Sequence, residues 1–286
     1  MESEDRARRR PHDLALRLSR AGAAACSQIV EWARAIRLAA AHVGSGRREL
    51  AIALSAYGLY AVVKGLWGGS LQQGVANAEG VVDLERRLGM FVEQDLQRAF
   101  VDNGLGMPFW NGFYLASQIV VLPLTLLLVF LLARRAYGLL RNLAILSWSG
   151  GLVWYALQPV APPRLAGYGL DTISSQTFFH LDSELARTFY NPVAAMPSLH
   201  VGMAPVVGWA LWRLTPWLWS RGLGLAYPLI VSITVVVTGN HYLLDIAGGL
   251  AVVLPAAALA RLLTGTPLPS VGRRGAAGAR TSGSTA

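Results

Sequence analysis

Apolar residues are gathered into long runs along this chain, and polar residues stand in the breaks between the runs. Inside a bilayer the backbone has to satisfy its own hydrogen bonds, which favours α-helices. Six runs are long enough, or nearly so, to cross a hydrocarbon core of about 30 Å as helices. They cover residues 50–67, 112–133, 139–158, 197–214, 220–238 and 241–263. The pattern therefore predicts an all-α, polytopic membrane protein with a bundle of six transmembrane helices.

Two longer and more polar segments, 69–110 and 159–196, interrupt the apolar runs. In the first of them, acidic residues such as Glu79, Asp83 and Glu85 alternate with apolar residues at helical spacing. This pattern predicts interfacial helices that lie along the membrane surface. The predicted organisation has three parts. They are a basic cytosolic N-terminal arm (1–48), a six-span membrane catalytic domain (49–265) and a disordered cytosolic tail (266–286).

Composition agrees with a lipid environment. Of the 286 residues, 53% are hydrophobic and 14% are charged, whereas a soluble domain carries about 25% charged residues. The net charge of +9 comes largely from arginines at the two ends of the chain and in short breaks, which is typical of membrane flanks and not of a nucleic-acid-binding face. The single cysteine, Cys26, excludes an internal disulfide and a cysteine-based zinc site.

Short basic loops predict the orientation. The N-terminal arm, the link at 134–141, the link at 213–221 and the tail all fall on one side of a six-span bundle. The positive-inside rule makes that side cytoplasmic. We therefore expect an integral plasma membrane protein with both termini in the cytoplasm, and with segments 69–110 and 159–196 at the extracytoplasmic face.

Three polar motifs lie at that same extracytoplasmic end of the predicted bundle. They are Pro162-Pro163-Arg164-Leu165 after the third span, Met196-Pro197-Ser198-Leu199-His200 at the start of the fourth, and His241-Tyr242-Leu243-Leu244-Asp245 at the start of the sixth. Because they were found by composition and not by position, their meeting at one end is independent support for a single site.

The residue types in these motifs suit phosphate chemistry. His241 and Asp245 are four residues apart, so they share a face of one helix, and the carboxylate can fix the tautomer that leaves the other nitrogen free to attack. His200 can protonate a leaving oxygen. Pro197 suits the first turn of a helix, where Ser198 would lie among free N–H groups that favour an anion. Arg164 offers a forked donor that matches phosphate oxygens.

The motifs resemble those of the type 2 phosphatidic acid phosphatase superfamily, most closely its inositol-phosphorylceramide-synthase-like (inositolphosphotransferase) branch. The resemblance covers residues 80–260 and includes Gly248-Gly249 after the third motif. It implies that His241 is the nucleophile, that Asp245 orients it, and that His200 is the acid and then the base. It also implies that Arg164 and Ser198 bind phosphate, and that neither a metal nor an organic cofactor is needed.

Two positions depart from the phosphatase members of that family. The phosphatase members carry a lysine seven residues before the arginine of the first motif, where this chain has Leu157. They also carry an arginine six residues before the histidine of the third motif, where this chain has Val235. A less positive phosphate site suits a singly charged phosphodiester better than a doubly charged monoester. The departures favour transfer of a phospho-headgroup.

Several functional hypotheses remain open from the sequence. The first is a phosphoinositol-type transferase that uses a lipid phosphate donor and a lipid or glycolipid alcohol acceptor. The second is a phosphatase of a lipid phosphate or polyprenyl (di)phosphate. The third is a non-catalytic scaffold or a transporter, in which case the ionisable residues would be expected at the bilayer midplane. Ser198 has the alternative role of capping the fourth helix. The sequence predicts no oligomeric state.

Overall fold

The computed structural model describes residues 43–67, 69–176, 191–215 and 217–265, together with the single residues 27 and 30. Most of the predicted N-terminal arm and the whole of the predicted tail, 266–286, lie outside these ranges. The described part of the chain is helical and contains no strand.

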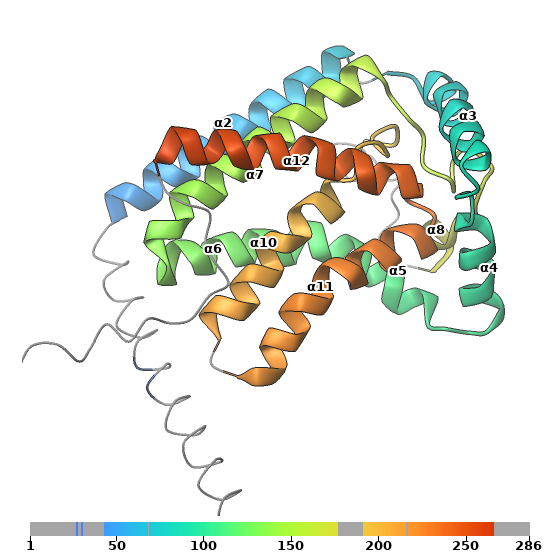
Figure 1. The fold of residues 1–286 in the computed structure, drawn as a ribbon. Helices are drawn as coiled ribbons and strands as arrows, with labels where there is room; N and C mark the ends of the chain where they lie inside the picture. Colours follow the sequence, from blue (N-terminus) through green and yellow to red (C-terminus); the bar gives the residue numbers. More distant parts are fainter. Residues whose placement is uncertain are drawn as a thin grey trace, which may run out of the picture.

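The helices that cover the predicted spans form one bundle, and further helices gather at one end of it (Figure 1). The bundle is made of α2 (Val43–Trp67), α5 (Met107–Ala116), η1 (Ser117–Val121), α6 (Leu122–Leu132), α7 (Arg134–Leu157), α10 (Leu199–Leu214), α11 (Leu218–Val237) and α12 (Leu243–Thr264). The helices at this end are α3 (Leu71–Arg87), α4 (Glu93–Asp102) and α8 (Thr172–Gln176).

Four helices of the described chain are long and apolar enough to cross a membrane. They are Gly46–Trp67, Met107–Leu132, Leu218–Val237 and Leu243–Thr264. The prediction of an all-α membrane protein is confirmed, with four candidate spans in the described chain, whereas the predicted count of six spans stays a prediction. The other two predicted spans are helices, but α7 carries Arg134, Arg135 and Arg141, and α10 has only 16 residues. At about 1.5 Å per residue, α10 is roughly 24 Å long, shorter than a typical hydrocarbon core.

The apolar helix that ends at Leu132 begins at Met107 and not at residue 112, so its first turn takes up the end of the segment expected at the membrane surface. α5 and α6 are joined by the π-helical turn η1, in which the hydroxyl of Ser117 donates to the carbonyl of Tyr114 at 2.8 Å. π-turns of this kind are frequent at functional sites. Here the turn begins three residues after Tyr114, whose ring contacts that of His200, a predicted site residue.

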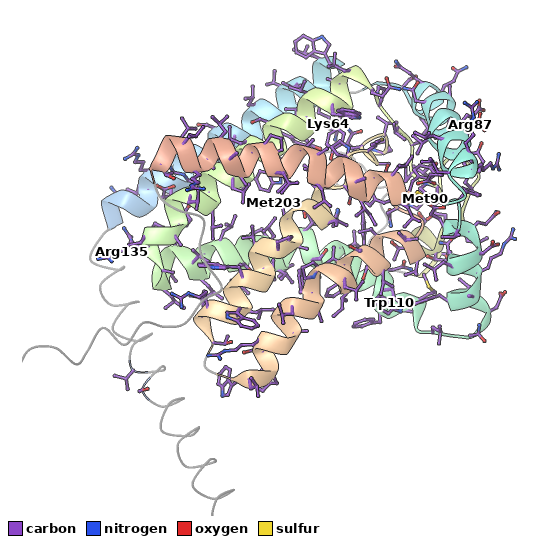
Figure 2. All side chains as sticks on the ribbon, in the orientation of Figure 1. Lys64, Arg87, Met90, Trp110, Arg135 and Met203 are labelled. Atoms are coloured by element: carbon purple, nitrogen blue, oxygen red, sulfur yellow. The ribbon has the colours of Figure 1, made fainter. Side chains whose placement is uncertain are left out.

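Close helix packing holds the bundle together. α10 and α11 pack side by side at Gly208 and Gly224, where a Cβ on either glycine would collide with the carbonyl oxygen of the other. α12 packs against α7 and α10. Figure 2 shows Met203 of α10 inside this bundle, where it is buried. Small residues at such crossings are typical of helix packing in membranes.

α3 and α4 are the amphipathic helices expected within 69–110, and both have a side that is buried against the rest of the molecule. α3 contacts the loop after α7, where the amide of Ala161 donates to the carbonyl of Gly74 at 2.9 Å and the side-chain amide of Asn77 donates to the carbonyl of Pro159 at 2.7 Å. The two helices thus form part of the wall around the region where the three motifs meet.

Candidate active site

The loops that carry the first two motifs are joined by backbone hydrogen bonds. The amide of Val160 donates to the carbonyl of Val193 at 2.9 Å, and the amide of Ala195 donates to the carbonyl of Val160 at 3.1 Å. These bonds form a short parallel bridge between Val160 and Ala194. As a result, the carbonyl of Ala195 reaches the third motif.

His241 has its two ring nitrogens in different environments. Nδ1 lies 2.7 Å from the carbonyl oxygen of Ala195 and 3.2 Å from Oδ2 of Asp245. A carbonyl oxygen can only accept, so Nδ1 carries the proton and donates it. Nε2 is buried and has no hydrogen-bond partner in the described part of the chain. The geometry leaves a lone pair on Nε2, as a nucleophile requires.

The prediction that His241 and Asp245 share one helix is wrong. α12 begins at Leu243, with Tyr242 as its N-cap residue, so His241 precedes the helix. The amides of Asn240 and His241 both donate to the carbonyl of Val235 at 3.1 Å, and Gly239 takes a left-handed φ of 67°. This turn returns the chain to α12. Asp245 still reaches His241 because its Oδ2 also accepts from the amide of Tyr242 at 2.9 Å.

His200 lies beside His241 at the start of α10. The centroids of the two imidazole rings are 5.7 Å apart, with an angle of 61° between their planes. The ring of Tyr114 stacks on the imidazole ring of His200, with a centroid separation of 4.4 Å. The structure therefore brings together the two histidines from the second and third motifs and orients His200 by an aromatic contact.

Ser198 is the N-cap residue of α10, but its side chain does not cap the helix. Its hydroxyl is buried and has no hydrogen-bond partner among the described residues. Its amide donates to the carbonyl of Asp245 at 2.9 Å, which fixes the second motif to the third. The expectation that Pro197 occupies the first helical turn is wrong, because α10 begins at Leu199 and Pro197 precedes the N-cap residue.

Arg164 is buried next to the third motif. Its amide donates to the carbonyl of Gly239 at 3.0 Å, and its Nε donates to Oδ1 of Asn240 at 3.0 Å. Its Nη1 lies 3.3 Å from Oδ2 of Asp171, whose side chain is partly exposed. The guanidinium is thus oriented by an amide and carries a carboxylate as counterion. Asp171 belongs to the polar segment 159–196 and was not predicted as a site residue.

α12 approaches the second motif closely at its two glycines. A Cβ on Gly249 would collide with the carbonyl oxygen of Ser198, and one on Gly248 would meet Met196 at 3.3 Å. The Gly248-Gly249 pair therefore allows α12 to pack closely against the second motif.

Sequence reasoning missed three buried residues of α3 and α4 near the motifs: Glu85, Glu93 and Gln97. Gln97 accepts from the amide of Leu170 at 2.7 Å and donates to the carbonyl of the same residue at 2.9 Å, which holds the loop after Arg164. A signal was present, because Glu85 continues the buried stripe of Ala78 and Val82 at helical spacing.

The two positions that depart from the phosphatase pattern lie in different surroundings. Val235 is completely buried in the bundle core, whereas Leu157 is 76% exposed at the end of α7. Neither contributes a charge to the site. The histidine, cysteine and acidic side chains of the described ranges include no group of three that could hold a metal ion.

Comparison with known proteins gives one match. No curated protein and no solved structure matches the chain. The family model described as the PAP2 superfamily matches residues 79–259, which is more than half of the chain and includes all five predicted site residues. The chain therefore belongs to the PAP2 (type 2 phosphatidic acid phosphatase) superfamily and is a membrane enzyme that acts on lipid phosphates.

Proposed function

We propose that this enzyme transfers a phospho-headgroup, of the phosphoinositol type, from a lipid donor to a lipid or glycolipid alcohol through a phosphohistidine on His241. The observation that carries the proposal is the environment of the His241 ring. Nδ1 is held by the carbonyl of Ala195 and by Asp245, while Nε2 is left without a partner among the described residues. An imidazole held in this way is oriented and activated for attack on phosphorus.

The proposed reaction has two displacement steps. In the first, the lone pair on Nε2 of His241 forms a bond to phosphorus while the bond from phosphorus to the leaving oxygen breaks, and His200 gives that oxygen a proton. In the second, His200 takes the proton of the acceptor hydroxyl, whose oxygen attacks phosphorus and releases His241. Asp245 stabilises the positive charge that the His241 ring carries while it is phosphorylated.

Arg164 and Ser198 are the proposed phosphate-binding residues. The guanidinium of Arg164 is oriented by Asn240, and the hydroxyl of Ser198 is buried without a partner in the described ranges. A fixed cation and a preorganised donor stabilise the charge that develops on the phosphate oxygens.

A phosphodiester donor is favoured over a phosphate monoester by the charge around Arg164. Asp171 lies 3.3 Å from its guanidinium and offsets part of its positive charge. Leu157 and Val235, which stand where the phosphatase members carry cations, add no charge. A site of low net positive charge suits one negative charge on the substrate better than two.

The proposed setting is an extracytoplasmic site in the plasma membrane. It consists of a basic cytosolic arm (1–48), a catalytic domain of six spans (49–265) and a cytosolic tail (266–286). α7 and α10 would be the two spans beyond the four that length and hydropathy indicate. α3 and α4 would lie at the outer interface beside the site, where a lipid headgroup is found.

The test compares wild type, His241→Ala and His42→Ala, the last as a control in the predicted cytosolic arm. Each purified protein is incubated in nanodiscs with phosphatidylinositol, phosphatidate or a polyprenyl diphosphate, with and without a lipid alcohol. Mass spectrometry identifies the products and the modification on the His241 peptide. We expect a new phosphodiester that forms only with phosphatidylinositol and acceptor, in wild type and His42→Ala alone.

Other outcomes separate the alternatives. Release of free phosphate from phosphatidate or the diphosphate, lost in His241→Ala, would establish a phosphatase and contradict the argument from charge. Full function of His241→Ala in cells would favour a scaffold or a transporter.

A further inference from the structure

Two glutamates lie buried against the start of α12, one from α3 and one from α4. In Figure 1 this start lies at the end of the bundle where α3 and α4 are gathered. Oε1 of Glu93 accepts from the amide of Leu243 at 2.8 Å, and Oε1 of Glu85 accepts from the amide of Leu244 at 2.7 Å. The first amides of a helix have no partner within the helix and carry its positive dipole, so carboxylates are well placed there.

Three consecutive backbone amides at this point therefore donate hydrogen bonds to carboxyl groups. The amide of Tyr242, just before those of Leu243 and Leu244, donates to Asp245 at 2.9 Å. His241 immediately precedes this stretch, and the carbonyl of Asp245 accepts from the amide of Ser198. A shift of the first turn of α12 would move the proposed nucleophile relative to the second motif.

The second oxygens of the two glutamates indicate a shared proton. Oε2 of Glu85 and Oε2 of Glu93 are both buried without a hydrogen-bond partner in the described ranges. Two carboxylates that share one buried site do not both ionise, and one proton between them is the usual arrangement. That proton would link Glu85 of α3 to Glu93 of α4 next to the first amides of α12.

We propose that Glu85 and Glu93 are positioning residues, an acid–carboxylate pair sharing one proton that holds the first turn of α12 and with it His241 in the geometry for attack. This inference rests on the proposed function. The pair touches neither substrate nor reacting atoms and acts through the backbone of Leu243 and Leu244.

The groups that face the pair determine its response to pH. Burial, the adjacent carboxyl group of Glu93 and the negative charge of Asp245 raise the pKa of Glu85 from 4.5 to about 8, against the hydrogen bond from Leu244, which lowers it. The phenol of Tyr242, which donates to the carbonyl of Ala161 at 3.2 Å, interacts electrostatically with both glutamates and with Tyr168. The neighbouring Arg86 side chain is largely exposed and faces Asp83, Phe91 and Tyr168.

The sign of the pH effect follows from the raised pKa. Between pH 4.5 and about 8, the unfolded chain loses the proton and the folded chain keeps it, so the free energy of unfolding falls as pH rises. Above about 8 the folded protein loses the proton as well. Two negative charges then repel each other beside Asp245, and the first turn of α12 loosens. We therefore expect kcat to decrease at alkaline pH as the pair loses its shared proton.

The test uses Glu93→Gln, Glu93→Ala and Glu79→Gln. The glutamine at position 93 keeps an acceptor for Leu243, and its Nε2 donates permanently to Glu85, so it replaces the shared proton. We expect Glu93→Gln to keep a kcat close to wild type at pH 7 and to lose the decline near pH 8. Glu93→Ala loses both bonds, and its kcat should fall by about 100-fold with a smaller change in KM. Glu79→Gln, exposed on α3, should match wild type.

Infrared spectroscopy detects the protonated carboxyl group without any substrate. The infrared carbonyl stretch of a protonated carboxylic acid should be present in wild type, titrate with a midpoint near pH 8, and be missing in Glu93→Gln. Glu85→Gln, which keeps the acceptor for Leu244, repeats the test if Glu93→Gln does not fold.

Contrary results are distinguishable. Identical pH profiles and infrared spectra for wild type and both glutamine variants would overturn the shared proton, and a wild-type kcat in Glu93→Ala would overturn the positioning role. A failure of the proposed function would appear separately, as undiminished activity in His241→Ala.

Discussion

The guanidinium of Arg164 is shared between Asn240 and Asp171, and the two partners have different consequences. Asn240 is neutral and buried, so it orients the arginine without changing its charge. Asp171 offsets the charge and is one-third exposed, so water weakens the interaction. In the proposed phosphate site, the preference for one or two negative charges on the substrate would therefore depend on Asp171 more than on Asn240.

Replacing Asp171 by asparagine tests this preference. The asparagine removes a negative charge beside Arg164, so binding of a doubly charged phosphate should improve more than binding of a singly charged one. We expect KM for phosphatidate to fall by about threefold to fivefold, the size expected for a partly exposed ion pair, with a smaller change for phosphatidylinositol. Steady-state kinetics on both lipids measure the effect, with Asp171→Glu as the charge-preserving control. Equal changes for both lipids would contradict the argument.

At the residue scale, part of the site could be predicted from the sequence. The motifs named His241, Asp245, His200, Arg164 and Ser198, and the structure brings these five residues together. Their catalytic and binding roles remain proposals. The role of the Ala195 carbonyl could not be predicted, because backbone groups leave no signal in residue type and the bond joins residues 46 positions apart.

At the element scale, α12 combines a start held by carboxyl groups with a close crossing one turn further on. Asp245, Glu85 and Glu93 hold its first amides. Gly249 then lets the helix pass against the backbone of Ser198. The helix is thus positioned from two directions near the proposed nucleophile.

Gly249→Ala tests the crossing. The added Cβ would collide with the carbonyl oxygen of Ser198, so α12 must move away from α10, and we expect the free energy of unfolding to fall by about 1–3 kcal/mol. Thermal unfolding in detergent measures the loss, and activity should decrease with it because Ser198 and His241 separate. Gly80→Ala on α3 is the matched control, because a Cβ there meets nothing within 4 Å. It should be neutral or stabilise by up to about 1 kcal/mol. Equal changes in thermal unfolding for the two variants would contradict a tight crossing.

At the scale of the whole molecule, the basic links and the motif-bearing segments lie at opposite ends of the bundle. Figure 2 shows Arg135, in the first turn of α7, far from Arg87, the last residue of α3, and from Met90, which follows that helix. This separation agrees with the predicted orientation, in which Arg135 faces the cytoplasm and Met90 the other side.

Cysteine accessibility tests the orientation. Cys26 is the only cysteine of the chain, so Cys26→Ser provides a background for Met90→Cys and Arg135→Cys, both at exposed positions. We expect a membrane-impermeant maleimide to label Met90→Cys in intact cells and to label Arg135→Cys only after permeabilisation. Arg134 and Arg141 remain to preserve the charge bias in Arg135→Cys. The reverse labelling would place the site on the cytoplasmic side. Labelling of both variants in intact cells would show that the two positions do not lie on opposite sides of the membrane.

The sequence by itself determined the features that depend on local composition. Apolar runs longer than a hydrocarbon core predict helices wherever they occur, because the unsatisfied backbone excludes other structures in lipid. α11 and α12 accordingly begin and end within two residues of their predicted bounds. The three motifs fall at one end because helix length and span order place them there.

Only the tertiary structure decided which groups hold the site in place. Leu244 bonds to Glu85 across 159 positions of the chain, and Leu243 bonds to Glu93 across 150. In the sequence, Glu93 looks like part of the solvated face of a surface helix, and helical spacing only aligns Glu85 with an apolar stripe. Both glutamates are nevertheless buried. Pairing of this kind depends on how α3 and α4 pack against α12, and packing between distant elements is not encoded in the local pattern of polar and apolar residues.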